Sequence, residues 1–344
     1  MIWLTWRQFR AQAVAMYAAV AAFAVVLAIT GPRLLRLSRA YPDSLLDQLT
    51  RTDRYYYSAG LVVLALAPAI VGAFWGAPMV ARELESGTHR LVWTQTVTRT
   101  RWLATKLGVT VLAAAAVVGV LTLAVSWWAE PLDGITGSAR GALPARLTPV
   151  AFAMRGIAPV GYAVFALVLG VAVGLVLRRT VPAMAVTLAV FTLVQIAVPL
   201  WVRPHLVPSV QQTVTIADHF DGIRIAEPGA AMQVSVSTGQ RGDWILSNET
   251  VDASGNKVAA LPSWLADCVP PPSPSSPPPA QSAEVRRGDL QACLVRLGDL
   301  GYRQRVVYQP ASRFWPLQWA ETALFGALAG LLTWFCFWWT RRAA

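Results

Sequence analysis

The chain has 344 residues, of which 55% are hydrophobic and only 14% are charged, and its formal net charge is +11. Ordinary soluble domains contain about 45–50% apolar and about 25% charged residues. The composition therefore argues against a soluble protein. The positive charges are divided among several short segments, so the net charge does not indicate nucleic acid as a partner.

The apolar residues form six blocks of 21 to 23 residues, and about 20 residues cross a bilayer as a helix. The blocks are Ala11–Gly31, Ser58–Val80, Leu107–Ala129, Gly156–Leu177, Val181–Trp201 and Leu317–Trp339. We therefore predict a mainly α-helical integral membrane protein with six transmembrane helices. The first block could instead be a signal peptide, but its apolar core is too long for one, so we count it as a span.

The first span lies between an aromatic, basic start and a polar loop. The start, MIWLTWRQFR, combines Trp3 and Trp6 with two arginines. This pattern is typical of a short interfacial helix and equally of an ordinary anchor. After the span we expect a loop of mixed charge, Pro32–Tyr57, on the other side of the membrane.

The second span contains Pro68 and Pro78, which break the helical hydrogen-bond ladder. They indicate either a kinked, moving helix or the ordinary proline content of membrane helices, and we favour the second interpretation. Three pairs of glycines spaced four residues apart predict close helix contacts, although this spacing is a weak signal. They are Gly72 with Gly76, Gly170 with Gly174, and Gly326 with Gly330.

The stretch Ala81–Lys106, ARELESGTHRLVWTQTVTRTRWLATK, is a short polar break between the second and third spans. Gly87 interrupts the helix that continues from the second span, and Thr88 can cap a new short helix. One side of that helix is apolar and carries Leu91, Val92 and Trp93. Such a side needs a cover, which a protein surface or a membrane surface supplies equally well.

The third span begins with a cap and a group of bases. Thr98 can cap its first turn. Arg99, Arg101 and Lys106 follow, at the level expected for lipid phosphates. We therefore expect this end of the span to lie at a membrane surface.

The residues between the fifth and sixth spans, 203–316, predict a small α+β domain. QQTVTIA and MQVSVST alternate as strands do, DASGNK is typical of a hairpin turn, and RQRVVYQ indicates a further strand. GDLQACLVRLGDLGY has helical spacing and a stop at Gly301. A proline-rich linker, 269–280, interrupts the domain. The predicted divisions are thus 1–202, 203–316 and 317–344.

Cys268 and Cys293 lie on either side of the proline-rich linker. Outside the cytoplasm such a pair readily oxidises, and we favour a disulfide over two free thiols. Cys336, within the last span, is expected to be a small apolar residue without a chemical role.

Glu321 is the ionisable residue of the sixth span, about one turn from its start. Carboxylates within membranes usually mark proton or ion relays. We expect Glu321 to reach water at the edge of the span and to have no partner in another span. A carrier driven by buried ionisable groups is therefore disfavoured.

The distribution of charge predicts the orientation. An even number of spans places both termini on one side, together with Ala81–Lys106 and the turn 178–180. That side carries eleven arginines and lysines and two glutamates, whereas the remaining segments carry 18 bases and 16 acids. Because positive charge in short loops marks the cytoplasmic side, we predict cytoplasmic termini in a plasma-membrane protein.

Motifs for chemistry within the chain are absent from the sequence. It has no G-x-x-x-x-G-K-[ST] phosphate loop, no G-x-S-x-G and no H-E-x-x-H, and its three histidines lack the spacing of metal ligands. We therefore expect neither an enzyme nor a bound cofactor or metal.

The polar break resembles a segment of permease subunits of ABC transporters of the type-2 exporter class. The resemblance consists of E-x-E-x-G-T, then V-[ST]-R, then a lysine in the next span. The matching residues are Glu83, Glu85, Gly87, Thr88, Val97, Thr98, Arg99 and Lys106. The RW-x-x-x-K ending and YQPASRFWPLQWAE before the last span resemble the actinobacterial branch. The layout of six spans agrees over the whole chain.

The resemblance implies an ATP-driven exporter in which a separate cytoplasmic ATP-binding subunit binds the coupling segment, Ala81–Lys106. Leu91, Trp93, Arg99 and Lys106 would belong to this coupling site, and Glu83 and Glu85 would pair with arginines of the segment or of the ATPase. Two departures are that Thr96 stands where the family often has proline, and that the loop before the sixth span is longer than in simpler exporters.

We therefore predict a permease subunit that works as a homo- or heterodimer in the lipid bilayer and moves an apolar or amphiphilic substrate outward. The alternative is a membrane protein that does not transport and whose inserted domain senses or binds a ligand. An adjacent gene for a protein with a phosphate loop would favour the permease.

Overall fold

The computed structural model describes most of the chain. The described residues are 2–41, 45–87, 98–133, 145–224, 232–238, 240, 242–258, 260–268 and 280–342. The chain divides into two compact units. The helical unit consists of Met1–Thr136, Leu143–Val207 and Ser312–Ala344, and the inserted unit consists of Gly137–Ala142 and Pro208–Ala311.

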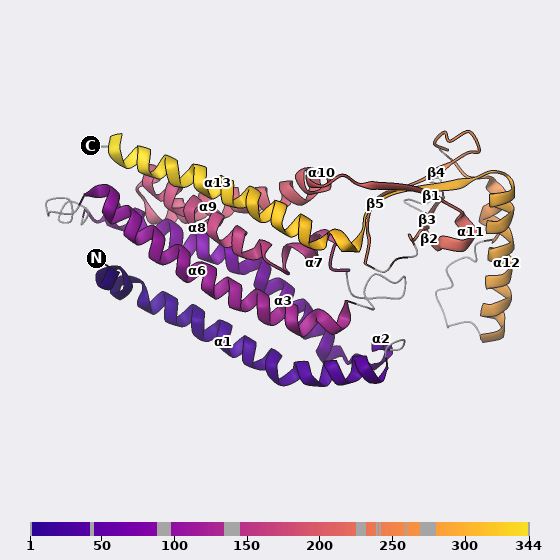
Figure 1. Cartoon of the computed structure of the whole chain (residues 1–344), viewed down its shortest axis with the longest axis horizontal. Coiled ribbons are helices and arrows are strands. Elements are labelled where there is room, and N and C mark those ends of the chain that lie inside the picture. Colours follow the sequence, from indigo (N-terminus) through magenta and orange to yellow (C-terminus); the bar gives the residue numbers. More distant parts are fainter. Residues whose placement is uncertain are drawn as a thin grey trace. The chain divides into compact units, whose positions relative to one another are not determined.

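Six helices of the helical unit are long and apolar enough to cross a membrane, which confirms the predicted number of spans. Five are α1 (Ile2–Ala40), α6 (Arg99–Ala129), α8 (Ala158–Leu177), α9 (Thr180–Ala197) and α13 (Phe314–Arg342). The remaining span comprises α3 (Arg51–Ile70), the π-helical η1 (Val71–Gly76) and α4 (Ala77–Glu85). The beginning of α1 and the end of α13 lie at the same end of this unit, which we call the terminal end (Figure 1).

The prediction of a loop over Pro32–Tyr57 is wrong. Helix α1 continues through Pro32 to Ala40, and a short helix α2 (Leu45–Gln48) precedes α3. Proline is tolerated in a membrane helix where neighbouring helices pack against the break. Here Trp128 of α6 donates a hydrogen bond to Thr30, which precedes the proline by two residues, with 2.9 Å between Nε1 and Oγ1.

Two of the glycine pairs pack against each other. A Cβ at Gly72 would lie 2.7 Å from the carbonyl oxygen of Ala166, and one at Gly174 would lie 2.8 Å from that of Ala77. The backbones of η1, α4 and α8 are therefore close enough that only glycine fits, which confirms the predicted close contact. Gly326 and Gly330 have no atom of the described residues within 4 Å of a built Cβ, so the prediction fails for them within this chain.

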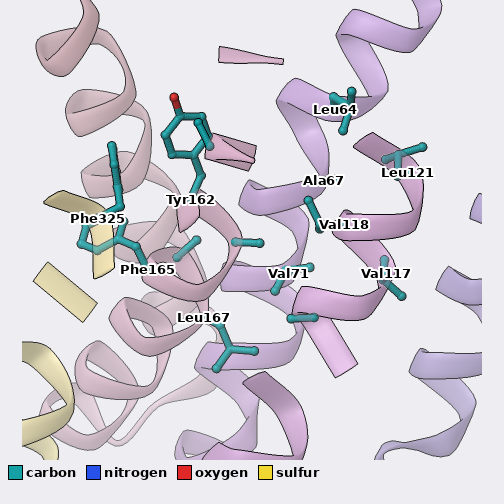
Figure 2. Packing of buried hydrophobic residues seen from close by; sticks show 14 of the residues in the cluster. Leu64, Ala67, Val71, Val117, Val118, Leu121, Tyr162, Phe165, Leu167 and Phe325 are labelled. Carbon is teal, nitrogen blue, oxygen red and sulfur yellow. The ribbon is translucent and has the colours of Figure 1, made fainter. Parts of the chain in front are cut away.

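The core of the helical unit is centred on α8. A larger share of the residues of α8 is buried than in any other of the six spans. Figure 2 shows apolar side chains of four spans meeting in this core. They are Leu64, Ala67 and Val71 of α3 and η1, Val117, Val118 and Leu121 of α6, Tyr162, Phe165 and Leu167 of α8, and Phe325 of α13. The outward faces of the other spans are exposed and apolar, as expected for helices that face lipid.

Short elements occupy the end of the helical unit opposite the terminal end, which we call the insertion end. They are η2 (Glu130–Leu132), α7 (Pro149–Ala153), the π-helical η3 (Val198–Val202) and α10 (Arg203–Leu206). The chain passes from α10 into the inserted unit and returns through η5 (Ala311–Arg313) to α13.

The inserted unit is an α+β fold. Its three-stranded antiparallel sheet has the order β1 (Val210–Val214), β5 (Arg303–Gln309), β4 (Trp244–Val251), and a second sheet pairs β2 (Phe220–Arg224) with β3 (Gln233–Val236). Val210 pairs with Tyr308, and Trp244 pairs with Gln309. The helical elements are α11 (Ile216–His219), η4 (Ser263–Cys268) and α12 (Ala280–Asp299), of which α12 supplies Leu294 and Leu297 to the core. The linker residues 269–279 lie outside the described residues.

Candidate functional site

At the terminal end, a buried ion pair joins α4 to α6. The ammonium of Lys106 donates to the carboxylate of Glu83. The Lys106 side chain is only 7% exposed, and its Nζ lies 4.7 Å from the centre of the Trp102 ring. A lysine that is buried this deeply needs an anionic partner, because an unpaired charge would lose its hydration without compensation. Glu83 and Lys106 therefore fix the first turns of α6 against α4.

A second carboxylate joins α4 to α9. Glu85 accepts hydrogen bonds from the backbone nitrogen of Thr180 at 2.9 Å and from its hydroxyl at 2.7 Å. Thr180 is the first residue of α9, and the preceding turn uses Arg178 in the left-handed region at φ 54°. Glu85 thus supplies, from another helix, an acceptor for the first amide of α9.

The structure describes the two ends of the predicted coupling segment, Ala81–Lys106, which carry these contacts, but not its middle. Gly87 has φ +71°, a conformation that glycine adopts readily, and the described part of the chain stops there. It resumes at Thr98, which caps α6 by accepting from the nitrogen of Arg101 at 3.3 Å, and Arg99 is the first residue of α6. The other predicted residues, Thr88, Leu91, Val92, Trp93 and Val97, lie outside the described residues.

We expected arginine partners for both glutamates of the segment. The structure gives Glu83 the lysine of α6 as an ion-pair partner and gives Glu85 the first turn of α9. Both glutamates therefore tie the start of the segment to other spans, one to α6 and one to α9. A force applied to the segment would reach both helices through these side chains.

At the insertion end, the expectation for Glu321 is wrong, because its carboxylate is buried and has partners on two other helices. Arg203 of α10 donates through Nε to Oε2 at 2.7 Å and through a terminal nitrogen to Oε1 at 2.9 Å. The hydroxyl of Tyr162 of α8 donates to Oε1 at 2.5 Å. The side chains of Arg203 and Glu321 are 0% and 1% exposed.

The sequence does not reveal this cluster, because the pattern of apolar blocks places Arg203 in the inserted domain. In the structure η3 and α10 extend the fifth span to Leu206, so the guanidinium reaches the depth of Glu321. It also donates to the carbonyl of Pro149 at 3.0 Å and lies 4.4 Å from the centre of the Phe152 ring. One sequence feature could have indicated the cluster: Arg203 follows the fifth apolar block, and Glu321, of opposite charge, lies near the start of the sixth.

In the inserted unit, Cys268 and Cys293 are joined by a disulfide that links η4 to α12. The guanidinium of Arg296 lies 4.7 Å from the centre of the Trp264 ring and supports the same junction. Within the described residues, no group of three or more His, Cys, Asp or Glu side chains could hold a metal ion.

Comparison with known proteins gives a family match. Residues 17–203 match the family model described as ABC-2 membrane transporter related. No curated protein and no solved structure matches the chain. The matched region begins within the first span, includes the next three spans and the polar segment, and ends at Arg203 near the end of the fifth span. The chain therefore belongs to the ABC-2 membrane transporter related family and is a multi-pass membrane permease.

Proposed function

We propose that the chain is the permease subunit of an ATP-driven exporter and that a separate ATP-binding subunit acts on the coupling segment, Ala81–Lys106. The observation that carries this proposal is the attachment of the start of that segment to two spans, through Glu83 to α6 and through Glu85 to α9. A partner that moves the segment would thereby move two helices. ATP hydrolysis is assigned to the partner, because the sequence contains no phosphate loop.

The terminal end faces the cytoplasm in this proposal. The excess of arginine and lysine at both termini and around the polar segment supports the orientation. The disulfide in the inserted unit supports it too, since disulfides persist in oxidising compartments. The RW-x-x-x-K ending of the segment supports an actinobacterial-like branch of the family.

The substrate is apolar or amphiphilic, and the working assembly contains two permease subunits, identical or different. The exposed faces of the spans carry mainly aliphatic and aromatic side chains, which favours substrates that partition into the bilayer. The rival function is ligand sensing by the inserted unit, which has its own core and disulfide.

The experiment uses inside-out membrane vesicles from cells that express the chain with its chromosomal neighbours, and measures ATP-dependent uptake of a fluorescent amphiphilic dye. We expect uptake that requires the chain, and a loss of more than about half of the initial rate in Glu85→Ala, because the segment then loses its tie to α9. Glu249→Ala is the matched control, since it removes an exposed ion pair with Lys257 in the inserted unit.

The proposal predicts that the control keeps the rate of the unaltered protein. Absence of ATP-dependent uptake, together with the absence of ATP hydrolysis in the purified assembly, would favour the sensing function. Equal losses in Glu85→Ala and Glu249→Ala would remove Glu85 from the coupling path.

A further inference from the structure

At the insertion end, a short, partly buried and broken helix precedes α8. Helix α7 covers only Pro149–Ala153, and a turn with Gly156 at φ +73° separates it from the start of α8. Residues Ala151 and Phe152 are fully buried, and Arg155 is 4% exposed. We call residues 149–157 the α7 turn. Irregular backbone at the depth of membrane spans is stable only if other groups satisfy its N–H and C=O groups.

One side chain of α13 satisfies three backbone groups in and beside the α7 turn. The Gln318 amide oxygen accepts from the nitrogen of Ala158 at 2.8 Å. Its amide nitrogen donates to the carbonyls of Phe152 at 3.1 Å and Arg155 at 2.9 Å. Gln318 is 0% exposed, so these bonds form in a site without water access. The fit is close, since a Cβ at Gly156 would lie 2.7 Å from the Gln318 oxygen.

Two further helices hold the same turn. From α6, the Thr122 hydroxyl donates to the carbonyl of Gly156 at 2.8 Å, and Ser126 accepts from the nitrogen of Gly156 at 3.3 Å. From α10, Arg203 donates to Pro149 while it is paired with Glu321 of α13. All these contacts are polar and made by side chains, so they can separate without breaking the backbone bonds of the helices that carry them.

The two side chains of α13 that make these polar contacts, Gln318 and Glu321, belong to the same helical turn. Gln318 and Glu321 are three residues apart, so they lie on the same face of α13. Directly beyond them, Phe325 packs against Tyr162 and Phe165 of α8, with ring centres 4.7 and 5.3 Å apart. A displacement of α13 alone would therefore separate Gln318, Glu321 and Phe325 from the turn and from α8 together.

We infer that the α7 turn is a gate at the insertion end, which opens when Gln318 and Glu321 of α13 move away from it. This inference rests on the proposed transport function, since only a permease requires such an opening. The polar contacts suit a gate because water can replace each hydrogen bond after separation. The aromatic contacts of α13, Phe325 with α8 and Phe314 with Phe152 of the turn, would be exposed at a cost proportional to their area, and they therefore favour the closed state. A fixed structural cap is the competing interpretation.

Hydrogen–deuterium exchange of the full-length chain in lipid nanodiscs separates the two interpretations. A gate opens on its own, so the amides of the buried residues Phe152, Arg155 and Ala158 should exchange at least about tenfold faster than those of residues 165–171 in α8, which are also buried. Gln318→Ala should accelerate exchange in the α7 turn by about a further tenfold and leave residues 165–171 unchanged. Thr322→Ala is the matched control, because its hydroxyl donates to the carbonyl of Gln318 within its own helix.

A fixed cap gives a different result. It would exchange together with α8, and Gln318→Ala would accelerate both segments equally, which would overturn the gate. Adding ATP to nanodiscs that contain the co-purified ATPase should increase exchange of the α7 turn by severalfold. If the turn opens independently of α8 but ATP has no effect, the gate stands and the ATP-driven function fails.

Discussion

At the scale of single residues, the charged side chains of the spans act as connectors between helices. Arg203 uses three nitrogens and Glu321 both oxygens, and a tyrosine hydroxyl completes the cluster. Such pairing offsets the large loss of hydration that a buried charge suffers. The net contribution to stability is small, but the removal of one partner leaves the other charge buried alone.

This asymmetry predicts the behaviour of variants at the insertion end. We expect Glu321→Ala to lower the free energy of unfolding by about 3–5 kcal/mol, because Arg203 then remains buried without its carboxylate. The double variant Arg203→Met with Glu321→Leu should recover most of that loss, since an apolar pair of similar volume has no charge to hydrate. Denaturant unfolding in detergent measures both, and equal losses in the single and double variants would contradict the argument.

Glu85 provides a residue-scale prediction at the terminal end. Without its carboxylate the first amide of α9 loses its acceptor, so Glu85→Ala should accelerate hydrogen exchange at residues 180–183 by severalfold. Glu85→Gln retains a carbonyl oxygen that can accept one bond, and should show a smaller acceleration. The measurement is exchange of the intact protein in nanodiscs, and unchanged exchange in Glu85→Ala would show that this cap is dispensable.

At the scale of elements, the closest packing in the helical unit is that of η1 and α4 against α8. The π-helical turn lies between Pro68 and Pro78, where the ladder of ordinary helical bonds is interrupted. Its glycines face α8, so backbone meets backbone without intervening side chains. We call this contact of Gly72 and Gly76 with α8 the glycine interface, and it forms only because these residues have no Cβ atoms.

Two substitutions test whether the glycine interface needs glycine: one at Gly170 of α8, inside the interface, and one at Gly326 of α13, outside it. A Cβ at Gly170 would lie 2.7 Å from the nitrogen of Ala77, so Gly170→Ala should reduce the free energy of unfolding by about 1–3 kcal/mol. Gly326→Ala meets no described atom within 4 Å and should be neutral or stabilise by up to about 1 kcal/mol. Thermal unfolding in the same detergent compares the two variants. Similar shifts of the unfolding midpoint in both would contradict the proposed need for glycine at the glycine interface.

The same elements show what the sequence could and could not predict. The spans were predictable because a long apolar block has few alternatives to a membrane helix. The strand Arg303–Gln309 coincides with RQRVVYQ, since alternation of side chains is a local property. The partners of Gln318 and Glu321 were not predictable, because they depend on which helices are neighbours. The strand β4, Trp244–Val251, was not predicted because half-buried polar side chains hide its alternation.

At the scale of the whole molecule, the chain combines a helical unit with an inserted unit that has a core of its own. The buried apolar residues of the inserted unit form one cluster, which includes Val214, Leu294 and Val306. Among the described residues, this cluster shares no member with the cluster of the spans. A separate core is the physical requirement for a part of a chain to fold and unfold by itself. We therefore expect the two units to lose their structure in separate transitions.

Removal of the disulfide between Cys268 and Cys293 tests whether the two units are stable independently of each other. Residues 268 and 293 are 25 positions apart, and closing a loop of this length stabilises a fold by about 3 kcal/mol by restricting the unfolded chain. Cys268→Ser with Cys293→Ser should therefore lower the unfolding midpoint of the inserted unit. The helical unit should keep its midpoint, because neither cysteine belongs to the described core of the spans. Hydrogen exchange followed separately in α12 and α8 measures both units in one sample, and a parallel loss of protection in α8 would show that the units unfold together.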